Sequence, residues 1–358
     1  MTKIRTSSIV WLAIGVLMIG SAMLVRWVVV PSLSKLPADL AQSQKYEGTM
    51  SALNPQAFAA NDLTNLITPD LPITANRSLT VEATDGDTAI VTSNSTLTLP
   101  DGSTQKDVHS YAVSRVDYRP IQLSAEQQQT LVPPNAQNTF EDHEGIAFSF
   151  PMNPQTDGYL LYDSVTRSGQ QAKFISEGTR EGRSVYNYEV NASGPITSPS
   201  VMAQFKDFPP QLPKAVIAGL LGANIVPLDA RAILHDNLAG LPDTVDIGFG
   251  SSNAVKLAVD TQFGAPLDVD QVQSMYVTVP VNGVNVPVLP LSTVRLQTAD
   301  SEVTKLADNL SENATLLTIL GVWLPAVMAV VGLLLVVLGC KRWRRPLGKD
   351  TERRLAHV

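Results

Sequence analysis

Cysteine is almost absent from this sequence of 358 residues, since Cys340 is the single one. The chain therefore forms no internal disulfide. A eukaryotic secreted domain of this size usually carries several disulfides, whereas bacterial exported domains often carry none. A core of this size is large enough to be stable without them.

Recognisable metal-binding and hydrolase patterns are also missing. The four histidines, at positions 109, 143, 235 and 357, lack metal-ligand spacing and have no cysteine to join them. The sequence has no Gly-x-Ser-x-Gly nucleophile elbow. The small residues at 248–252 are not followed by the Gly-Lys-Ser/Thr of a phosphate-binding loop. We therefore expect no metal, no cofactor and no covalent catalysis.

Charge is almost absent from two long apolar runs, one near each end of the chain. The first, Ile9 to Val30, is interrupted only by Arg26, and the second, Leu316 to Cys340, holds 25 residues without a charge. A helix needs about 20 mostly apolar residues to cross a bilayer. The sequence predicts transmembrane helices over 9–30 and 316–340, with a kink at Pro325 in the second.

A cleaved signal peptide is the alternative for the first run. Lys3 and Arg5 form a basic start, and residues 20–22 are small. The apolar run nevertheless continues to Val30, and no small-x-small cleavage site stands out. An uncleaved anchor is the favoured interpretation.

Basic residues flank both runs on the same side. Lys3 and Arg5 precede the first run, and seven lysines and arginines follow the second between residues 341 and 354. The positive-inside rule then predicts a two-pass plasma-membrane protein with cytoplasmic ends, 1–8 and 341–358, and an extracytoplasmic middle.

The middle segment is strongly acidic. Residues 31–315 contain 16 Lys and Arg against 31 Asp and Glu, a net charge of −15. This charge disfavours nucleic acid as a partner. It also disfavours non-specific adhesion to an anionic membrane surface.

The middle segment has the pattern of an α+β, mainly antiparallel β domain over 45–300. Runs rich in Val, Ile, Thr and Tyr alternate with turn signals such as Asp85-Gly86-Asp87. We expect a three-strand meander over 78–117 and further strands over 146–189 and 243–294. Helical spacing predicts a small insertion at 210–241, a stalk helix over 31–44 and a second stalk helix over 301–315.

An acidic motif surrounds His143, with Glu141 and Asp142 before it and Glu144 after it. Such a group is able to perform general acid–base chemistry. A solvated acidic loop in front of a strand at Ile146 is the favoured interpretation.

The segment 215–226 holds twelve uncharged, mostly apolar residues inside this acidic domain. It is either a buried core helix or a helix that lines a route for a lipid, where its small residues allow close approach. The candidate ligand-binding residues are Ile217, Leu220, Leu221 and Ile225.

Several short motifs resemble one known family. They are Gly145-Ile-Ala-Phe-Ser-Phe-Pro151, Tyr159 to Asp163, the positions Phe174, Gly178, Val185, Tyr186 and Tyr188, and Val259-Asp260-x-x-x-Gly264. With the two terminal spans, this pattern resembles an actinobacterial family of membrane-anchored proteins of unknown function labelled PorA. A transmembrane β-barrel needs many strands with an apolar outer face, whereas this chain has its long apolar runs in two helices.

The resemblance implies a role in building or moving lipoglycans such as lipomannan. The plan of the chain is also similar to the class B scavenger receptors, which have two terminal spans and a β-rich domain with a lipid tunnel, although their disulfides are missing here. One version of the predicted β domain is therefore barrel-like, with an internal tunnel.

Three functions remain open, and they differ in the surface they need. The leading hypothesis is an envelope protein that binds or transfers a lipid or lipoglycan and has an apolar tunnel. The alternative is an accessory subunit for envelope glycosyltransferases, with an exposed apolar patch that contacts other membrane proteins. The third is an enzyme acting on envelope glycans, with paired carboxylates in a cleft.

Overall fold

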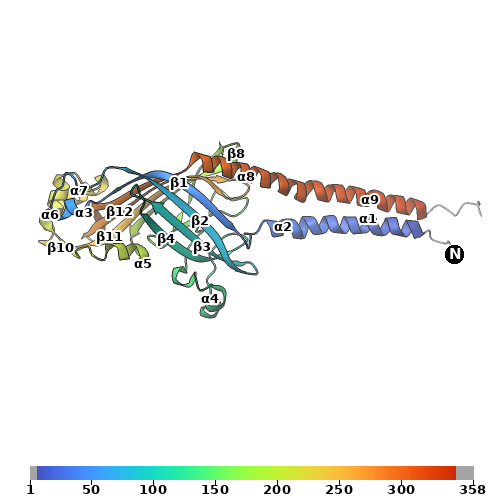
Figure 1. Cartoon of the computed structure of the whole chain (residues 1–358), viewed down its shortest axis with the longest axis horizontal. Helices are drawn as coiled ribbons and strands as arrows, with labels where there is room; N and C mark the ends of the chain where they lie inside the picture. Colours follow the sequence, from blue (N-terminus) through green and yellow to red (C-terminus); the bar gives the residue numbers. More distant parts are fainter. Residues whose placement is uncertain (1–5, 344–358) are drawn as a thin grey trace, which may run out of the picture. The chain divides into compact units, whose positions relative to one another are not determined.

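The structure is a computed structural model that describes residues 6–343. The predicted basic segments beyond these limits, with His357, lie outside the described residues. The chain divides into two compact units: the terminal segments up to Lys35 and from Asn309 form one, and Leu36–Asp308 forms the other. The first unit is helical and the second is built mainly of strands (Figure 1).

Each end of the chain contributes one long helix, of which the residues up to Lys35 and from Asn309 belong to the helical unit. Helix α1 (Thr6–Leu24) continues through a π-helical turn, Val25–Val29, into α2 (Val30–Leu33). Helix α8 (Asp300–Thr318) continues through a second π-helical turn, Ile319–Trp323, into α9 (Leu324–Trp343). Both predicted spans are helical, and both are long and apolar enough to cross a membrane.

The second π-helical turn explains how the helix tolerates Pro325. A proline removes one backbone hydrogen bond, and its ring crowds the carbonyl four residues earlier. That carbonyl belongs to Gly321, inside the turn at Ile319–Trp323. The wider turn accommodates the proline without ending the helix.

Helices α1 and α9 approach each other closely at two glycines. A Cβ atom placed on Gly15 would lie 2.6 Å from the carbonyl oxygen of Gly332, and one on Gly332 would lie 2.8 Å from the carbonyl oxygen of Gly15. Any larger residue therefore pushes the two backbones apart. Such contacts allow van der Waals packing to hold helices together where apolar surroundings give no hydrophobic drive.

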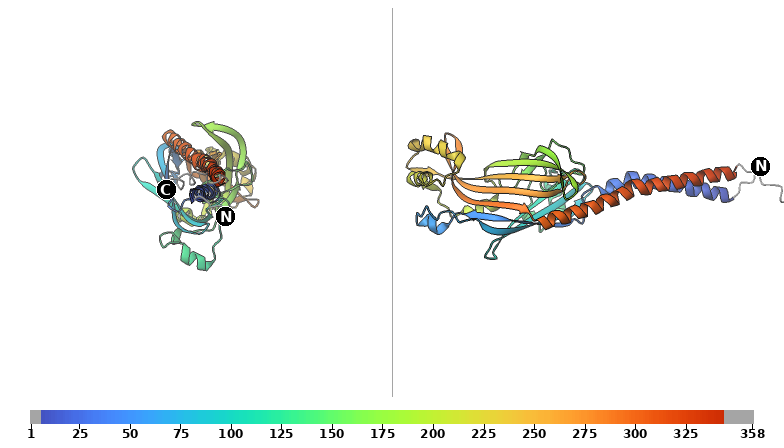
Figure 2. Two further views of the ribbon diagram at one scale, coloured as in Figure 1. Left: turned by 90° about the vertical axis from the view of Figure 1, so that its right-hand side faces the viewer. Right: turned by 90° about the horizontal axis from the view of Figure 1, so that it is seen from above.

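The β domain is organised around one antiparallel sheet of nine strands in the order β4-β3-β2-β1-β13-β12-β11-β8-β7 (Figures 1 and 2). Its strands are β1 (Ala41–Ala52), β2 (Leu71–Asp85), β3 (Thr88–Thr98), β4 (Thr104–Ser114), β7 (Lys173–Arg180), β8 (Arg183–Pro195), β11 (Gly248–Asp260), β12 (Pro266–Val281) and β13 (Val284–Thr298). The predicted fold class, mainly antiparallel β with a few helices and two terminal apolar helices, is confirmed.

The predicted stalk helix over 31–44 is wrong beyond Leu33. Residues from Ala41 onward form β1, which pairs with β13, the last strand of the sheet. Leu36, which supplied part of the helical spacing, is buried in the core, and its backbone N–H donates to the carbonyl of Arg115 at 2.8 Å. The leucine spacing reflects contacts with the core rather than a helix face.

The barrel-like form of the prediction is also wrong. Among the described residues the sheet is open, with β4 and β7 as its edges. Residues 146–162 pack against β2–β4 on one side and against β8 and β11 on the other. We call the face of the sheet that contacts this segment the inner face. Next to β2–β4, β8 and β11, the segment fills the space that an internal tunnel would need.

The family motifs meet where this segment reaches the β11–β12 turn. Asp260 is fully buried, accepts hydrogen bonds from the backbone of that turn and pairs with Arg183 at 2.8 Å. The carbonyl of Gly264, a residue with φ of +69°, accepts hydrogen bonds from the backbone N–H of Phe150 and the hydroxyl of Ser149. These motif residues therefore hold the fold together.

Short elements complete the domain. They are α3 (Pro55–Ala59), α4 (Ala125–Leu131), α5 (Pro199–Met202), α6 (Lys214–Gly222), α7 (Leu228–Asn237), the hairpin β5 (Leu160–Asp163) and β6 (Ser168–Gln171), the hairpin β9 (Gln211–Pro213) and β10 (Thr244–Asp246), and 3₁₀ turns at Gln137–Thr139, Ala203–Phe205 and Leu238–Gly240. Helices α3, α6 and α7 gather at one end of the sheet, which we call the tip (Figure 1). The predicted insertion at 210–241 forms much of this tip.

Candidate functional site

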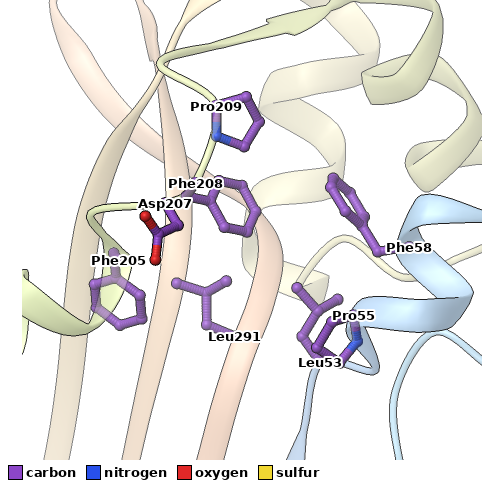
Figure 3. Close-up of a pocket in the computed structure, with 8 residues that line it drawn as sticks. All are labelled: Leu53, Pro55, Phe58, Phe205, Asp207, Phe208, Pro209 and Leu291. Atoms are coloured by element: carbon purple, nitrogen blue, oxygen red, sulfur yellow. The ribbon is translucent and has the colours of Figure 1, made fainter.

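An apolar groove opens at the tip of the β domain (Figure 3). Its volume is about 320 Å³, within the range of small-molecule sites. Its lining comes from the end of β1, from α3, from the segment after α5 and from β13. The lining residues are Leu53, Pro55, Phe58, Phe205, Asp207, Phe208, Pro209 and Leu291.

Aromatic rings that contact one another line this groove from more than one side (Figure 3). The rings of Phe58 and Phe208 lie 5.5 Å apart, and Phe205 stacks on Phe249 at 4.7 Å. Phe208 also meets Phe249 edge to face at 5.9 Å. The three lining phenylalanines are half-buried, so each keeps apolar surface free for a ligand.

Asp207 is the single charged residue among the eight that line the groove, and it lies between Phe205 and Leu291 (Figure 3). Its carboxylate is exposed. A carboxylate accepts hydrogen bonds from hydroxyl or ammonium groups and repels anions. The groove therefore suits an apolar chain whose polar end carries no negative charge.

The candidate residues of the sequence-predicted helix lie beside this groove rather than in its lining. Ile217 and Leu220 of α6 are completely buried, and Leu221 and Ile225 are half-buried against the same core cluster. That cluster also contacts Leu53, Phe58, Phe205 and Phe208. Helix α6 packs in the same core cluster that the groove residues contact, and direct lipid contact by the four candidate residues stays a prediction.

The acidic motif around His143 is not the solvated loop that the sequence predicted. The side chain of Glu141 is 10% exposed and His143 is 8% exposed, whereas Asp142 and Glu144 are exposed. The ring of His143 lies 4.9 Å from that of Tyr111 and 5.6 Å from that of Tyr162. Aromatic packing therefore draws this part of the loop into the core.

Glu141 joins three parts of the domain. Its Oε1 lies 2.9 Å from Nδ1 of His109 on β4, and its Oε2 lies 3.2 Å from Nε of Arg167 in the β5–β6 turn. Nε2 of His109 lies 3.0 Å from Oδ1 of Asp107. We call Asp107, His109, Glu141 and Arg167 the ionisable cluster.

The two histidines of this region have opposite pKa shifts. Burial lowers the pKa of His109, but hydrogen bonds and charge from Asp107 and Glu141 outweigh burial and raise it to about 9. Burial dominates at His143 and lowers its pKa to about 4, despite nearby Glu141 and Asp142. At neutral pH His109 is charged and His143 is neutral.

The charges of the ionisable cluster neutralise one another. Two carboxylates face one guanidinium and one imidazolium, and the arrangement ties the loop before residue 146 to the edge strand β4. Within residues 6–343, no three His, Cys, Asp or Glu side chains come together in an arrangement able to hold a metal ion. The cluster is therefore best described as a structural tie.

The sequence of residues 7–340 matches the family described as Porin PorA. No curated protein matches the chain. Solved structures with partial likeness include the peroxisomal multifunctional enzyme type 2 of Drosophila melanogaster, with 13% identity, 71% of this chain and 37% of that chain covered, and a TM-score of 0.12. Another is a putative oleoyl thioesterase of Lactobacillus plantarum, with 12% identity, 82% and 88% covered, and a TM-score of 0.11. Scores this low support no inference about this chain.

Proposed function

We propose that this chain, which belongs to the Porin PorA family, is a membrane-anchored protein whose β domain binds the apolar chain of a lipid without covalent catalysis. One observation carries the proposal, namely the groove lined by three half-buried phenylalanines and two leucines. Each methylene removed from water contributes about 0.8 kcal/mol. A site of this composition therefore gains affinity mainly from the chain of its ligand.

The two apolar helices support anchoring by two passes. The proposal places both ends of the chain in the cytoplasm and the β domain outside the plasma membrane. Its support is the basic sequence that begins in the last turn of α9 with Lys341 and Arg342 and continues to Arg354. The tight packing of α1 on α9 at Gly15 and Gly332 also favours a first helix that stays in the protein rather than a cleaved signal.

The proposal assigns no pore to the sheet. A membrane-spanning barrel must close on itself because lipid cannot satisfy free strand edges. In the described residues β4 and β7 are such edges. We therefore base the function on binding rather than on conduction through strands.

A role as an accessory subunit of envelope glycosyltransferases is the second candidate. Large apolar side chains stand exposed at the tip, with Leu228 at 79%, Val284 at 61% and Ile233 at 45%. Exposed apolar side chains of this kind favour contact with another protein when they form a continuous patch. A lipoglycan as the bound lipid would connect both candidates.

Photocrosslinking tests the leading proposal directly. The full-length protein is placed in lipid nanodiscs containing a lipid with a diazirine in its alkyl chain, and the labelled residues are mapped by mass spectrometry. We expect labels near Leu53, Phe58 and Phe208 in addition to those in the spans. Phe208→Ala should reduce the groove labels several-fold, whereas the matched control Phe174→Ala, half-buried in another cluster, should not. Labels confined to the membrane helices would overturn the proposal.

A further inference from the structure

We propose that the bound chain continues out of the groove along the inner face of β1, β13 and β12, over Met50, Val294 and Met275. The ligand class is then a long single alkyl chain with a polar head that carries no negative charge. This inference rests on the proposed function. It adds the direction in which the bound alkyl chain runs.

Strand register places these side chains in adjacent rows. Met50 pairs with Val294, and Val294 pairs with Gln273. In the next row towards the tip, Ser292 pairs with Met275. Residues directly opposite one another on neighbouring strands point to the same face of a sheet, so the two rows lie side by side.

Two contacts identify this face as the inner one. Gln273 pairs with Asn253, whose Nδ2 donates to Oδ1 of Asp163 at 3.0 Å, and Asp163 directly follows the segment that fills the inner face. Met275 packs in one cluster with Val165 and Phe205. Since Phe205 also lines the groove, the inner face and the groove share a wall.

Burial along the inner face changes near the groove. Val190, Leu257 and Val259, which contact the filling segment, are buried. Met50 and Val294 are only half-buried. The cover on the inner face is therefore incomplete next to the groove, and apolar surface remains available there.

The distance and the chemistry both suit an alkyl chain. Val294 follows the groove residue Leu291 by three positions, which is about 10 Å along a strand. Methionine side chains are flexible and polarisable, so Met50 and Met275 adapt to a mobile chain. Asp207 at the groove disfavours an anionic head group there.

A chain-length series measures the proposed path. The full-length protein, held in amphipol, is titrated with alkyl maltosides of 8, 10, 12 and 14 carbons below their micelle concentrations, and occupancy is read by native mass spectrometry. Complete burial of each added methylene should raise affinity about fourfold. We expect the gain to continue through 14 carbons.

Two variants locate the path. Val294→Trp should fill it and abolish the gain beyond the shortest chain, while leaving affinity for the 8-carbon probe within about twofold. Val272→Trp is the matched control, because Val272 lies on β12 one position away from the row of Gln273 and points to the opposite face. Val294→Ala, which fills nothing, should keep most of the chain-length gain and covers the case in which the tryptophan variant fails to fold.

The outcomes separate the two proposals. If affinity stops rising after the shortest alkyl chains, or still rises with chain length in a folded Val294→Trp variant, the proposed path is overturned and groove binding is left intact. Loss of binding for every chain length, including the 8-carbon probe, overturns the proposed function itself. A continuing gain removed by Val294→Trp and retained by Val272→Trp supports the path.

Discussion

The ionisable cluster and the groove are two contrasting parts of one domain. In the cluster, the largely buried side chains of His109 and Glu141 lie within 3.2 Å of partners of opposite charge, of which Asp107 and Arg167 are partly exposed. In the groove, rings stack on one another yet stay half-buried. Buried charge with perturbed pKa values is a usual sign of a functional site, but here each charged group lies next to a group of opposite charge, whereas the apolar surface of the groove has no such partner. The less polar region is therefore the better candidate for binding.

Among the substitutions that test this contrast, removal of the Glu141 carboxylate should have one of the largest effects on stability. Glu141→Ala removes the carboxylate that His109 and Arg167 share and leaves Asp107 as the one acidic neighbour of the largely buried His109. We expect a loss of about 3 kcal/mol in the free energy of unfolding, the low end of the range for a broken buried pair, measured by denaturant unfolding of the full-length protein. The matched control is Glu144→Ala, an exposed position three residues away, which should change stability by less than about 0.5 kcal/mol. Equal effects would mean that the cluster does not tie β4 to the loop.

Substitutions in helix α6 test the apolar core next to the groove in the same way. Leu220 is fully buried and Leu221 is half-buried on the next position. Leu220→Ala should cost about 2–5 kcal/mol, and Leu221→Ala about half as much, in the same unfolding measurement. If Leu221→Ala instead abolishes lipid crosslinking while stability is kept, the helix lies in the ligand path rather than behind it.

Stability should depend on pH in opposite directions at the two histidines. His109 has a raised pKa, so its contribution is complete below its unfolded pKa of 6.5 and is lost as pH rises towards about 9. His143 has a lowered pKa, so its contribution is complete above 6.5 and is lost as pH falls towards about 4. Each shift corresponds to about 3 kcal/mol.

Melting temperature against pH checks this expectation. The two histidines together predict a maximum near pH 6.5, and His143→Gln should flatten the acid side alone. The exposed His235, replaced by Gln, serves as the control and should leave the profile unchanged. A profile that His109→Gln does not alter on the alkaline side would contradict the assigned role of its two carboxylate neighbours.

Substitution of a groove residue should have the smallest effect on stability. Phe208→Ala removes a half-buried ring, so we expect a loss of about 1–2 kcal/mol, below the range for fully buried phenylalanines. The same variant should lose most of its lipid labelling. A large loss of stability with unchanged labelling would make the groove ordinary core and reverse the contrast with the cluster.

Local patterns predicted much of the fold. The turn Asp85-Gly86-Asp87 and the β-rich runs around it correspond to the β2–β3 hairpin, in which Gly86 has a φ of +56°. Length and lack of charge were sufficient to find both terminal helices. These features depend on residues close together in the sequence, where period and turn chemistry carry the information.

Long-range contacts explain what the sequence could not indicate. The run at 146–150 alternates like a strand, but only Ile146 makes an isolated bridge, because the backbone of Phe150 bonds to the β11–β12 turn instead. Glu141 looks solvated in sequence and becomes buried only once His109 and Arg167 surround it. The groove combines Leu53, Phe208 and Leu291, which no local pattern connects.

The pairing of β1 with β13 also sets an order of events during synthesis. Tyr46 pairs with Thr298, so the ribosome must add roughly 250 residues after the first strand before the middle of the sheet can form. At about 5–20 residues per second, β1 waits on the order of 12 to 50 s with one edge unpaired. Non-local pairing of this kind also slows folding. During this interval the nascent chain exposes an edge to which other strands can add, so we expect its export and its folding to be coupled in time.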